Sequence, residues 1–237
     1  MAQKFDGVSD LEEYLSGILK AGTKIRSIQC CGNSYSEEDC EHLAKMITER
    51  EQSGEFTQVD FSDMFTSRVL ENLCPALRHL VDAIAPLSIT HLNMSHNAFG
   101  PNGVREFEGQ FSSQFISMTH LNIMNCGLGP EGTETMAQAF IANGSIKLKQ
   151  LLISRNRVED KGAEALAEYF NTYDELEHLE IYQNGLEKDA FTALMPSLEG
   201  SAESGSLKHL DLNDNRCGDN KKAVKAICGL LGKCTQL

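Results

Sequence analysis

Apolar residues recur along the chain in a fixed pattern, at positions one, four and six of each copy, and position nine is most often Asn. Ile89, Leu92, Met94 and Asn97 form one copy of this pattern. The first positions of seven successive copies fall at residues 25, 56, 89, 118, 148, 176 and 207. The steps between them are 31, 33, 29, 30, 28 and 31 residues, a nearly constant spacing that indicates an internal repeat.

Each copy predicts a short strand followed by a helix. The alternating apolar positions of the first part lie on one face of an extended strand, and apolar residues then recur every three or four residues, as in a helix. The helical spacing occurs at Ala163, Leu166, Ala167 and Phe170, at Val104, Phe107 and Phe111, at Gly132, Met136 and Phe140, and at Val224, Ile227 and Leu231.

This pattern is typical of a leucine-rich repeat, and a repeat of about 29 residues has room for a full helix. The predicted fold class is therefore α/β. We expect an open, horseshoe-shaped solenoid of about seven repeats, with a parallel sheet on the concave side and helices on the convex side.

The ninth position takes Asn because its amide can bond the backbone of the tight turn and of the neighbouring repeat. Cys126 occupies this position in one repeat, as the pattern allows. Met64 occupies it in the second repeat and cannot make these bonds. We therefore expect the second repeat to be locally irregular.

The chain divides into two predicted parts. Residues 1–24 contain Ser9 and Glu12, spaced as a capping box, and then an apolar stripe at helical spacing, so they predict an N-terminal helical cap. Residues 25–237 form the leucine-rich-repeat domain. Leu237 lies where an eighth repeat would begin, so we expect either a fragment of a longer array or an end that pairs with another copy.

The charge limits the choice of partner. The chain has 34 acidic and 21 basic residues, a formal net charge of −13. Nucleic-acid binding needs a surplus of Lys and Arg, so the charge argues against it, and also against adsorption to an anionic membrane. No signal peptide and no apolar stretch of membrane-spanning length occurs, so we expect no membrane insertion and an intracellular protein. A basic protein surface is the partner such a charge attracts.

The sequence offers few motifs for chemistry of its own. The eight cysteines form no CxxC pair, which favours free thiols in a reducing compartment; of Cys30 and Cys31, one should be buried and one exposed. Four histidines precede the second apolar position of their repeats, namely His91, His120, His178 and His209. A metal site between His91 and His120 is conceivable, but a recurring repeat position is the favoured interpretation. No nucleotide-binding or hydrolase motif is present, so we expect no independent catalytic site.

The loops that leave the strands should lie along one edge of the horseshoe and form a rim of hydrogen-bonding groups. Six stretches of sequence resemble the Ran GTPase-activating protein family, and they are FSDMFTSRV (61–69), NAFGPNGVREFE (97–108), GLGPEG (127–132), SRNRVEDKGAEALAE (154–168), QNGL (183–186) and LDLNDN (210–215). Their order and spacing match the family over residues 25–237. SDMFT-R and NAFGP are not shared by leucine-rich repeats in general.

The resemblance implies a function through a partner. Members of the family dock their loop edge on the GTP form of Ran, a small G protein, and accelerate its own GTP hydrolysis, so GTP and Mg²⁺ belong to the partner and this chain would need no cofactor. The resemblance also implies a cytoplasmic location, including the nuclear periphery, and a role in nucleocytoplasmic transport.

Asn125 matches the family's catalytic position, an Asn that orders the partner's Gln. Its amide offers two donors and an acceptor, which suits that task. The alternative is that Asn125 supplies turn bonds that Cys126 cannot make. The remaining expected partner-binding residues on the loops are Arg68, Asp63, His96, Arg157, Gln183 and Asp214.

The chain also departs from the family. Ser67 replaces a usual Gly, Cys74-Pro75 shifts a helix Pro by one position, and family members have more repeats and an acidic tail. Two rival interpretations stay open: a non-catalytic leucine-rich-repeat scaffold for protein interaction, and a clamp like the ribonuclease inhibitor.

Overall fold

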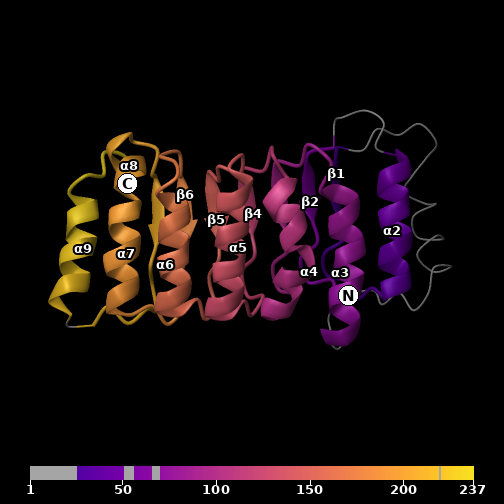
Figure 1. The fold of residues 1–237 in the computed structure, drawn as a ribbon, viewed down its shortest axis with the longest axis horizontal. Helices are drawn as coiled ribbons and strands as arrows, with labels where there is room; N and C mark the ends of the chain where they lie inside the picture. Colours follow the sequence, from indigo (N-terminus) through magenta and orange to yellow (C-terminus); the bar gives the residue numbers. More distant parts are fainter. Residues whose placement is uncertain (1–25, 51–55, 66–69, 219) are drawn as a thin grey trace.

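The computed structural model describes residues 26–50, 56–65, 70–218 and 220–237. Strands and helices alternate along this part of the chain (Figure 1). The elements are β1 (Ser27–Gln29), α2 (Glu37–Arg50), β2 (Gln58–Asp60), α3 (Leu70–Ile84), β3 (His91–Asn93), α4 (Gly100–Ser113), β4 (His120–Asn122), α5 (Gly129–Asn143), β5 (Gln150–Leu152), α6 (Glu159–Phe170), β6 (His178–Glu180), α7 (Lys188–Ser197), α8 (Glu199–Glu203), β7 (His209–Asp211) and α9 (Lys221–Leu231).

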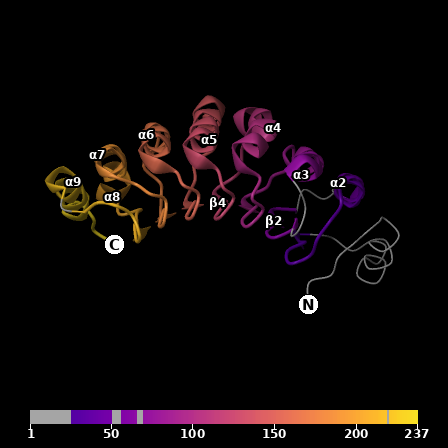
Figure 2. The same cartoon turned by 90° about the horizontal axis from the view of Figure 1, so that it is seen from below.

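The seven strands form one open sheet in chain order, and each strand pairs in parallel with the next. The register matches the sequence repeat, because Leu92 of β3 pairs with Leu121 of β4, and Leu121 pairs with Leu151 of β5. Figure 2 shows the strands along the inner side of an arc and the helices along its outer side. The predicted α/β leucine-rich-repeat solenoid is confirmed.

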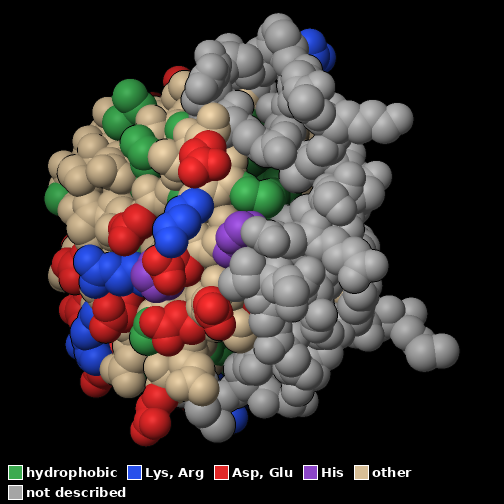
Figure 3. All heavy atoms as spheres, turned by 90° about the vertical axis from the view of Figure 1, so that its right-hand side faces the viewer, with side chains coloured by type: hydrophobic (Ala, Val, Ile, Leu, Met, Phe, Trp, Pro, Cys, Tyr) green, Lys and Arg blue, Asp and Glu red, His purple; other side chains and the backbone are tan. Residues whose placement is uncertain are grey.

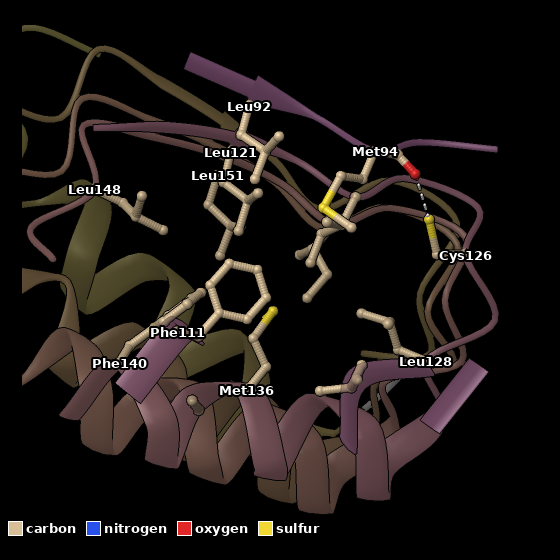
Figure 4. Packing of buried hydrophobic residues seen from close by; sticks show 14 of the residues in the cluster. Leu92, Met94, Phe111, Leu121, Cys126, Leu128, Met136, Phe140, Leu148 and Leu151 are labelled. Carbon is tan, nitrogen blue, oxygen red and sulfur yellow. Dashed lines mark hydrogen bonds between the residues drawn. The ribbon is translucent and has the colours of Figure 1, made fainter. Parts of the chain in front are cut away.

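The core lies between the sheet and the row of helices (Figure 4). Leu92, Leu121 and Leu151 stack from successive strands and face aromatic side chains of the helices. Phe111 and Phe140, of α4 and α5, contact edge to face with ring centroids 5.4 Å apart. Each such side chain contributes about 1.5–3 kcal/mol through burial, so the contacts between neighbouring repeats supply most of the stability.

A ladder of buried Asn side chains joins the repeats at the ninth position. Asn156 donates from Nδ2 to the carbonyl oxygens of Ile153, in its own repeat, and Ile123, in the preceding one, at 2.9 and 2.8 Å. Its Oδ1 accepts the N–H of Cys126 at 2.9 Å. Asn97, Asn184 and Asn215 make corresponding bonds.

Met64 disturbs the second repeat less than its sequence predicts. Strand β2 keeps regular parallel pairing on both sides. The Met64 N–H donates to Asn97 Oδ1 at 2.9 Å, so the ladder of the third repeat still holds this turn. The irregularity lies one residue further on, where Ser34 and Phe65 form an isolated antiparallel bridge.

The predicted apolar stripe of the last helix is only partly buried. In α9, Val224 and Leu231 are 44% and 49% exposed. Ala223 and Leu230 are buried instead, because they lie on the side of the helix that packs against the preceding helices. The helix predicted from the spacing of Val224, Ile227 and Leu231 is therefore confirmed, although its outer apolar positions stay exposed.

Several predictions fall on residues outside the described part of the chain. These are the helical cap of residues 1–24, with Ser9 and Glu12, and the loop residues Ser67 and Arg68. Within the described residues, none of the helices has both the length and the apolar character that a bilayer crossing requires.

The described side chains at the end of the array that carries α2 mix both signs of charge (Figure 3). Within α2, Lys45 pairs with Glu41 at 3.0 Å, and His79 of α3 approaches Glu37 of α2 at 3.7 Å. Such exposed pairs contribute about 0–1 kcal/mol each. This end face therefore shows no single-signed patch among its described residues.

Candidate functional site

A row of residues with left-handed backbone runs along the loop edge. In six successive repeats, the residue directly before the ladder position has a φ between 48° and 62°. These residues are Asp63, His96, Asn125, Arg155, Gln183 and Asp214. Asn, Asp and His tolerate this conformation better than other side chains. Arg155 and Gln183 lack that tolerance, and strain of this kind, about 1–3 kcal/mol per residue, is concentrated at functional sites.

Backbone hydrogen bonds fix the row in place. The N–H of Asn125 donates to the carbonyl of Ser154 at 3.0 Å, and the N–H of Arg155 donates to that of Tyr182 at 3.0 Å. Asp63, His96 and Gln183 donate to the next repeat in the same way. The following repeat therefore sets the position of each of these five residues, whereas Asp214 lies in the last described repeat.

The central part of the row lines a hollow at the loop edge. His96, Asn125, Arg155, Arg157 and Glu159 contribute side chains to it. The other residues that line it have no side chain or a short or rigid one, and they are Gly127, Gly129, Ala98 and Pro130. The structure thus brings together three residues predicted separately from the sequence: His96, Asn125 and Arg157.

Asn125 is held by a side chain from the preceding repeat. Its Nδ2 lies 3.1 Å from His96 Nδ1. Because an amide nitrogen only donates, Nδ1 acts as the acceptor, and the neutral ring then carries its proton on Nε2. This bond uses one N–H and fixes the plane of the amide, which has a second N–H and an acceptor oxygen. Asn125 is half-buried, whereas His96 is exposed.

The alternative role of Asn125, as a substitute for a ladder Asn, is wrong. The Cys126 thiol itself donates to the carbonyl of Met94 at 3.2 Å, a bond drawn in Figure 4. Cys126 also keeps its N–H on the ladder through Asn156. The described side-chain bond of Asn125 goes to His96 instead.

We expect the buried thiols to resist alkylation in the folded protein. Burial raises the pKa of Cys126 and of Cys30 to about 12, and only the thiolate reacts. Iodoacetamide at pH 8 should label the exposed Cys31 and Cys228 and spare the two buried residues, as mass spectrometry of peptides can show. Cys30 is buried and Cys31 exposed, as predicted.

The same shift makes stability depend on pH. A thiol whose pKa is raised by folding stabilises the folded state fully below its unfolded pKa of about 8.5. That contribution is lost as the pH rises from there toward about 12. Equal labelling of all four cysteines at pH 8, in protein that gives a native melting curve, would contradict the assignment.

A second hollow adjoins the first. Arg157, Glu159, Asp160, Gln183 and Arg216 line it, with Asn184, Gly185 and Glu187. Gln183 and Arg157, which the sequence interpretation assigned to partner binding, both line it. Asp160 Oδ1 accepts the N–H of Glu187 at 2.7 Å, which joins the first turn of α6 to the start of α7.

The other predicted partner-binding residues lie further out. Asp63 and Asp214 are exposed at the two ends of the described row, outside both hollows, and Arg68 lies outside the described residues. The sequence interpretation missed Arg155, which lines the first hollow. The available signal was its place directly before Asn156, the same place that Asn125 has before Cys126.

An arc of parallel strands joined by an Asn ladder, with helices on the outer side and a polar loop edge, defines a leucine-rich-repeat protein with long α/β repeats. A family model described as Leucine Rich repeat matches residues 86–107, 116–137 and 144–167.

Within that class, this chain is similar in sequence to Ran GTPase-activating proteins. It is 33% identical over 194 residues to Ran GTPase-activating protein 1 of Xenopus laevis, covering 77% of this chain and 33% of the relative. It is 31% identical over 202 residues to Ran GTPase-activating protein of Drosophila melanogaster, covering 81% and 33%. It is 29% identical over 194 residues to Ran GTPase-activating protein 2 of Caenorhabditis elegans, covering 77% and 20%. The chain therefore spans about a third or less of the length of these relatives.

Proposed function

We propose that this chain is a GTPase-activating protein for a Ran-like small GTPase in its GTP form. The names of its relatives support the activity and the partner. The structural observation that carries the proposal is Asn125, held by His96 at the wall of an open hollow. GTP and Mg²⁺ would be bound by the partner, and this chain would bring no cofactor.

In this proposal, Asn125 orients a Gln of the partner that positions the attacking water. Two amides can pair through an N–H donor and a carbonyl acceptor on each, which fixes the plane of both. The His96 bond and the left-handed backbone set the orientation of Asn125 before the partner arrives. Donors oriented in advance are effective because they need no rearrangement in the transition state.

The rest of the rim would bind the partner. Asp63, His96, Arg157, Gln183 and Asp214 stand at successive loops, and Arg68 joins them by resemblance. Arg155 lies between Asn125 and Arg157 in the same hollow, so we add it to this set. The net charge of −13 favours a basic partner surface, with association that slows as salt is added. We place this activity in the cytoplasm, including the nuclear periphery.

The proposal is tested by single-turnover GTP hydrolysis. A Ran-type GTPase loaded with labelled GTP is mixed with a tenth of its concentration of this chain. We expect all the GTP to be hydrolysed, at a rate raised on the order of 10³-fold or more, as for other activators. A pull-down with the GTP-loaded partner runs in parallel. Binding without acceleration would support the scaffold interpretation, and neither binding nor acceleration would reject both.

We expect His96→Gly to reduce the acceleration about 2- to 10-fold, the value of one hydrogen bond. Glycine suits the positive φ at this position, so the loop keeps its conformation. At saturating chain, where a weaker binding of the partner does not lower the rate, the reduction should vanish in an Asn125→Gly background, because His96 affects the rate through Asn125. His79→Ala, on α3, is the matched control and should change nothing. Fully additive losses in the double variant would show that His96 does not act through Asn125.

A further inference from the structure

Strands β6 and β7 carry a pattern that the proposed function does not use. Their sequences are His-Leu-Glu and His-Leu-Asp, and they pair in register, His178 with His209 and Glu180 with Asp211. Side chains two residues apart on a strand share a face. Leu179 is buried in the core, so the two histidines and two carboxylates form a two-by-two array on the concave face.

Three of these side chains already lie at near-ligand distances. His178 Nε2 and Glu180 Oε1 are 3.0 Å apart. The rings of His178 and His209 have centroids 4.1 Å apart. One nitrogen or oxygen of each of the three residues lies within 4.8 Å of the other two. Ligand atoms of a tetrahedral zinc ion are separated by roughly 3.3 Å, given bonds of about 2.0 Å. Modest side-chain rotations close that difference.

We propose that His178, Glu180 and His209 form a binding site for a divalent transition-metal ion of the zinc type. Two imidazoles and one carboxylate favour zinc, nickel or copper over magnesium and calcium, which prefer oxygen ligands alone. Asp211, adjacent in register to Glu180, adds a second negative charge near the ion, and it or a water completes the coordination. The ion would link β6 to β7 across the concave face.

The first pair of histidines shows why the carboxylates matter. His91 and His120 stack with centroids 3.9 Å apart, at the same repeat positions on β3 and β4. The residues that follow at the acidic positions are the neutral Asn93 and Asn122. Among the described residues, the group of three metal-ligand side chains is found on β6 and β7 and not between His91 and His120. The stacked pair on β3 and β4 therefore lacks a third ligand group of this kind in the described part of the chain.

The experiment is titration calorimetry of the full chain, stripped with a chelator, with zinc chloride at neutral pH. We expect one equivalent to bind to the site. His209→Ala and Glu180→Gln should each weaken this binding at least about 10-fold, since even outer-sphere partners of metal ligands contribute 10- to 100-fold. His120→Ala is the matched control and should bind as the unmodified chain does. Zinc should also raise the melting temperature of the unmodified chain and not of His209→Ala.

Cobalt substitution separates this site from the exposed thiols Cys31 and Cys228. Nitrogen and oxygen ligands give d–d bands without thiolate charge transfer. Retention of the full affinity in both His209→Ala and Glu180→Gln would overturn the proposal. So would a dominant thiolate band in the one-equivalent complex. His209 is exposed, so its replacement leaves the core intact, and metal-free melting curves check this.

Discussion

Asn125→Gly should abolish most of the acceleration of GTP hydrolysis while leaving the protein folded. Removing one oriented donor from a catalytic site costs about 10²–10³-fold in rate. Glycine is the suitable replacement because Asn125 has a φ of 55°, a conformation in which alanine would be strained. The readout is the single-turnover rate at saturating chain, which separates loss of activation from loss of binding.

Two further variants make this result specific. Asn125→Asp keeps the shape and tolerates the same backbone but offers no N–H, so it should be as inactive as the glycine variant. Asn102→Ala changes an exposed Asn in the first turn of α4, whose described side-chain contact is Arg105, and it should stay fully active. If Asn125→Gly activated hydrolysis within about 3-fold of the unmodified chain, far from the expected 10²-fold, the role of Asn125 would be rejected.

Asn156→Ala should cause the largest loss of stability, about 3–5 kcal/mol in the free energy of unfolding. The side chain is fully buried. It accepts the N–H groups of Cys126 and Leu128 and donates to the carbonyls of Ile123 and Ile153. Alanine leaves the N–H groups of Cys126 and Leu128 and the carbonyl of Ile123 without this partner, whereas the carbonyl of Ile153 keeps its bond from Asn184. Each orphaned group costs about 1–3 kcal/mol. Urea unfolding followed by circular dichroism gives the value.

Asn122→Ala is the matched control for this measurement. Asn122 lies half-buried on the concave face of β4, and its Oδ1 accepts one N–H, from Met124 at 3.1 Å. Its removal should cost about 1 kcal/mol or less, because water can replace that bond. Similar losses of stability in the two variants would mean that Asn at the ladder position stabilises the fold no more than Asn on the concave face does.

The repeat pattern predicted the sheet well because each strand needs only alternate apolar residues and a neighbour of the same kind. The order and register of all seven strands follow from the positions of residues such as Leu92, Leu121 and Leu151. The pattern could not predict that Val224 and Leu231 stay exposed, because burial depends on which side of α9 another helix covers.

The candidate site was predictable only in part. Resemblance pointed to Asn125, but Arg155 and Gln183 are residue types that do not favour a positive φ, so their identity alone does not indicate it. The bond from Asn125 to His96 joins residues 29 positions apart, and it depends on the rotamers of both. The group at His178, Glu180 and His209 was not predicted from the sequence. His178 and Glu180 lie two residues apart on one strand, whereas His209 comes from the next repeat, so both spacings must be considered together to find the group.

The row of left-handed residues presents side chains at regular intervals along the loop edge. Neighbouring residues of the row are one repeat apart, which is roughly 4.8 Å where the strands pair. The six described positions from Asp63 to Asp214 therefore cover roughly 24 Å. Substitutions at adjacent positions of the row share neighbours, so their effects on the free energy of binding should be coupled. Substitutions two or more positions apart should have additive effects on that free energy. A surface organised in this way can change the side chain at one position while the other positions keep their place.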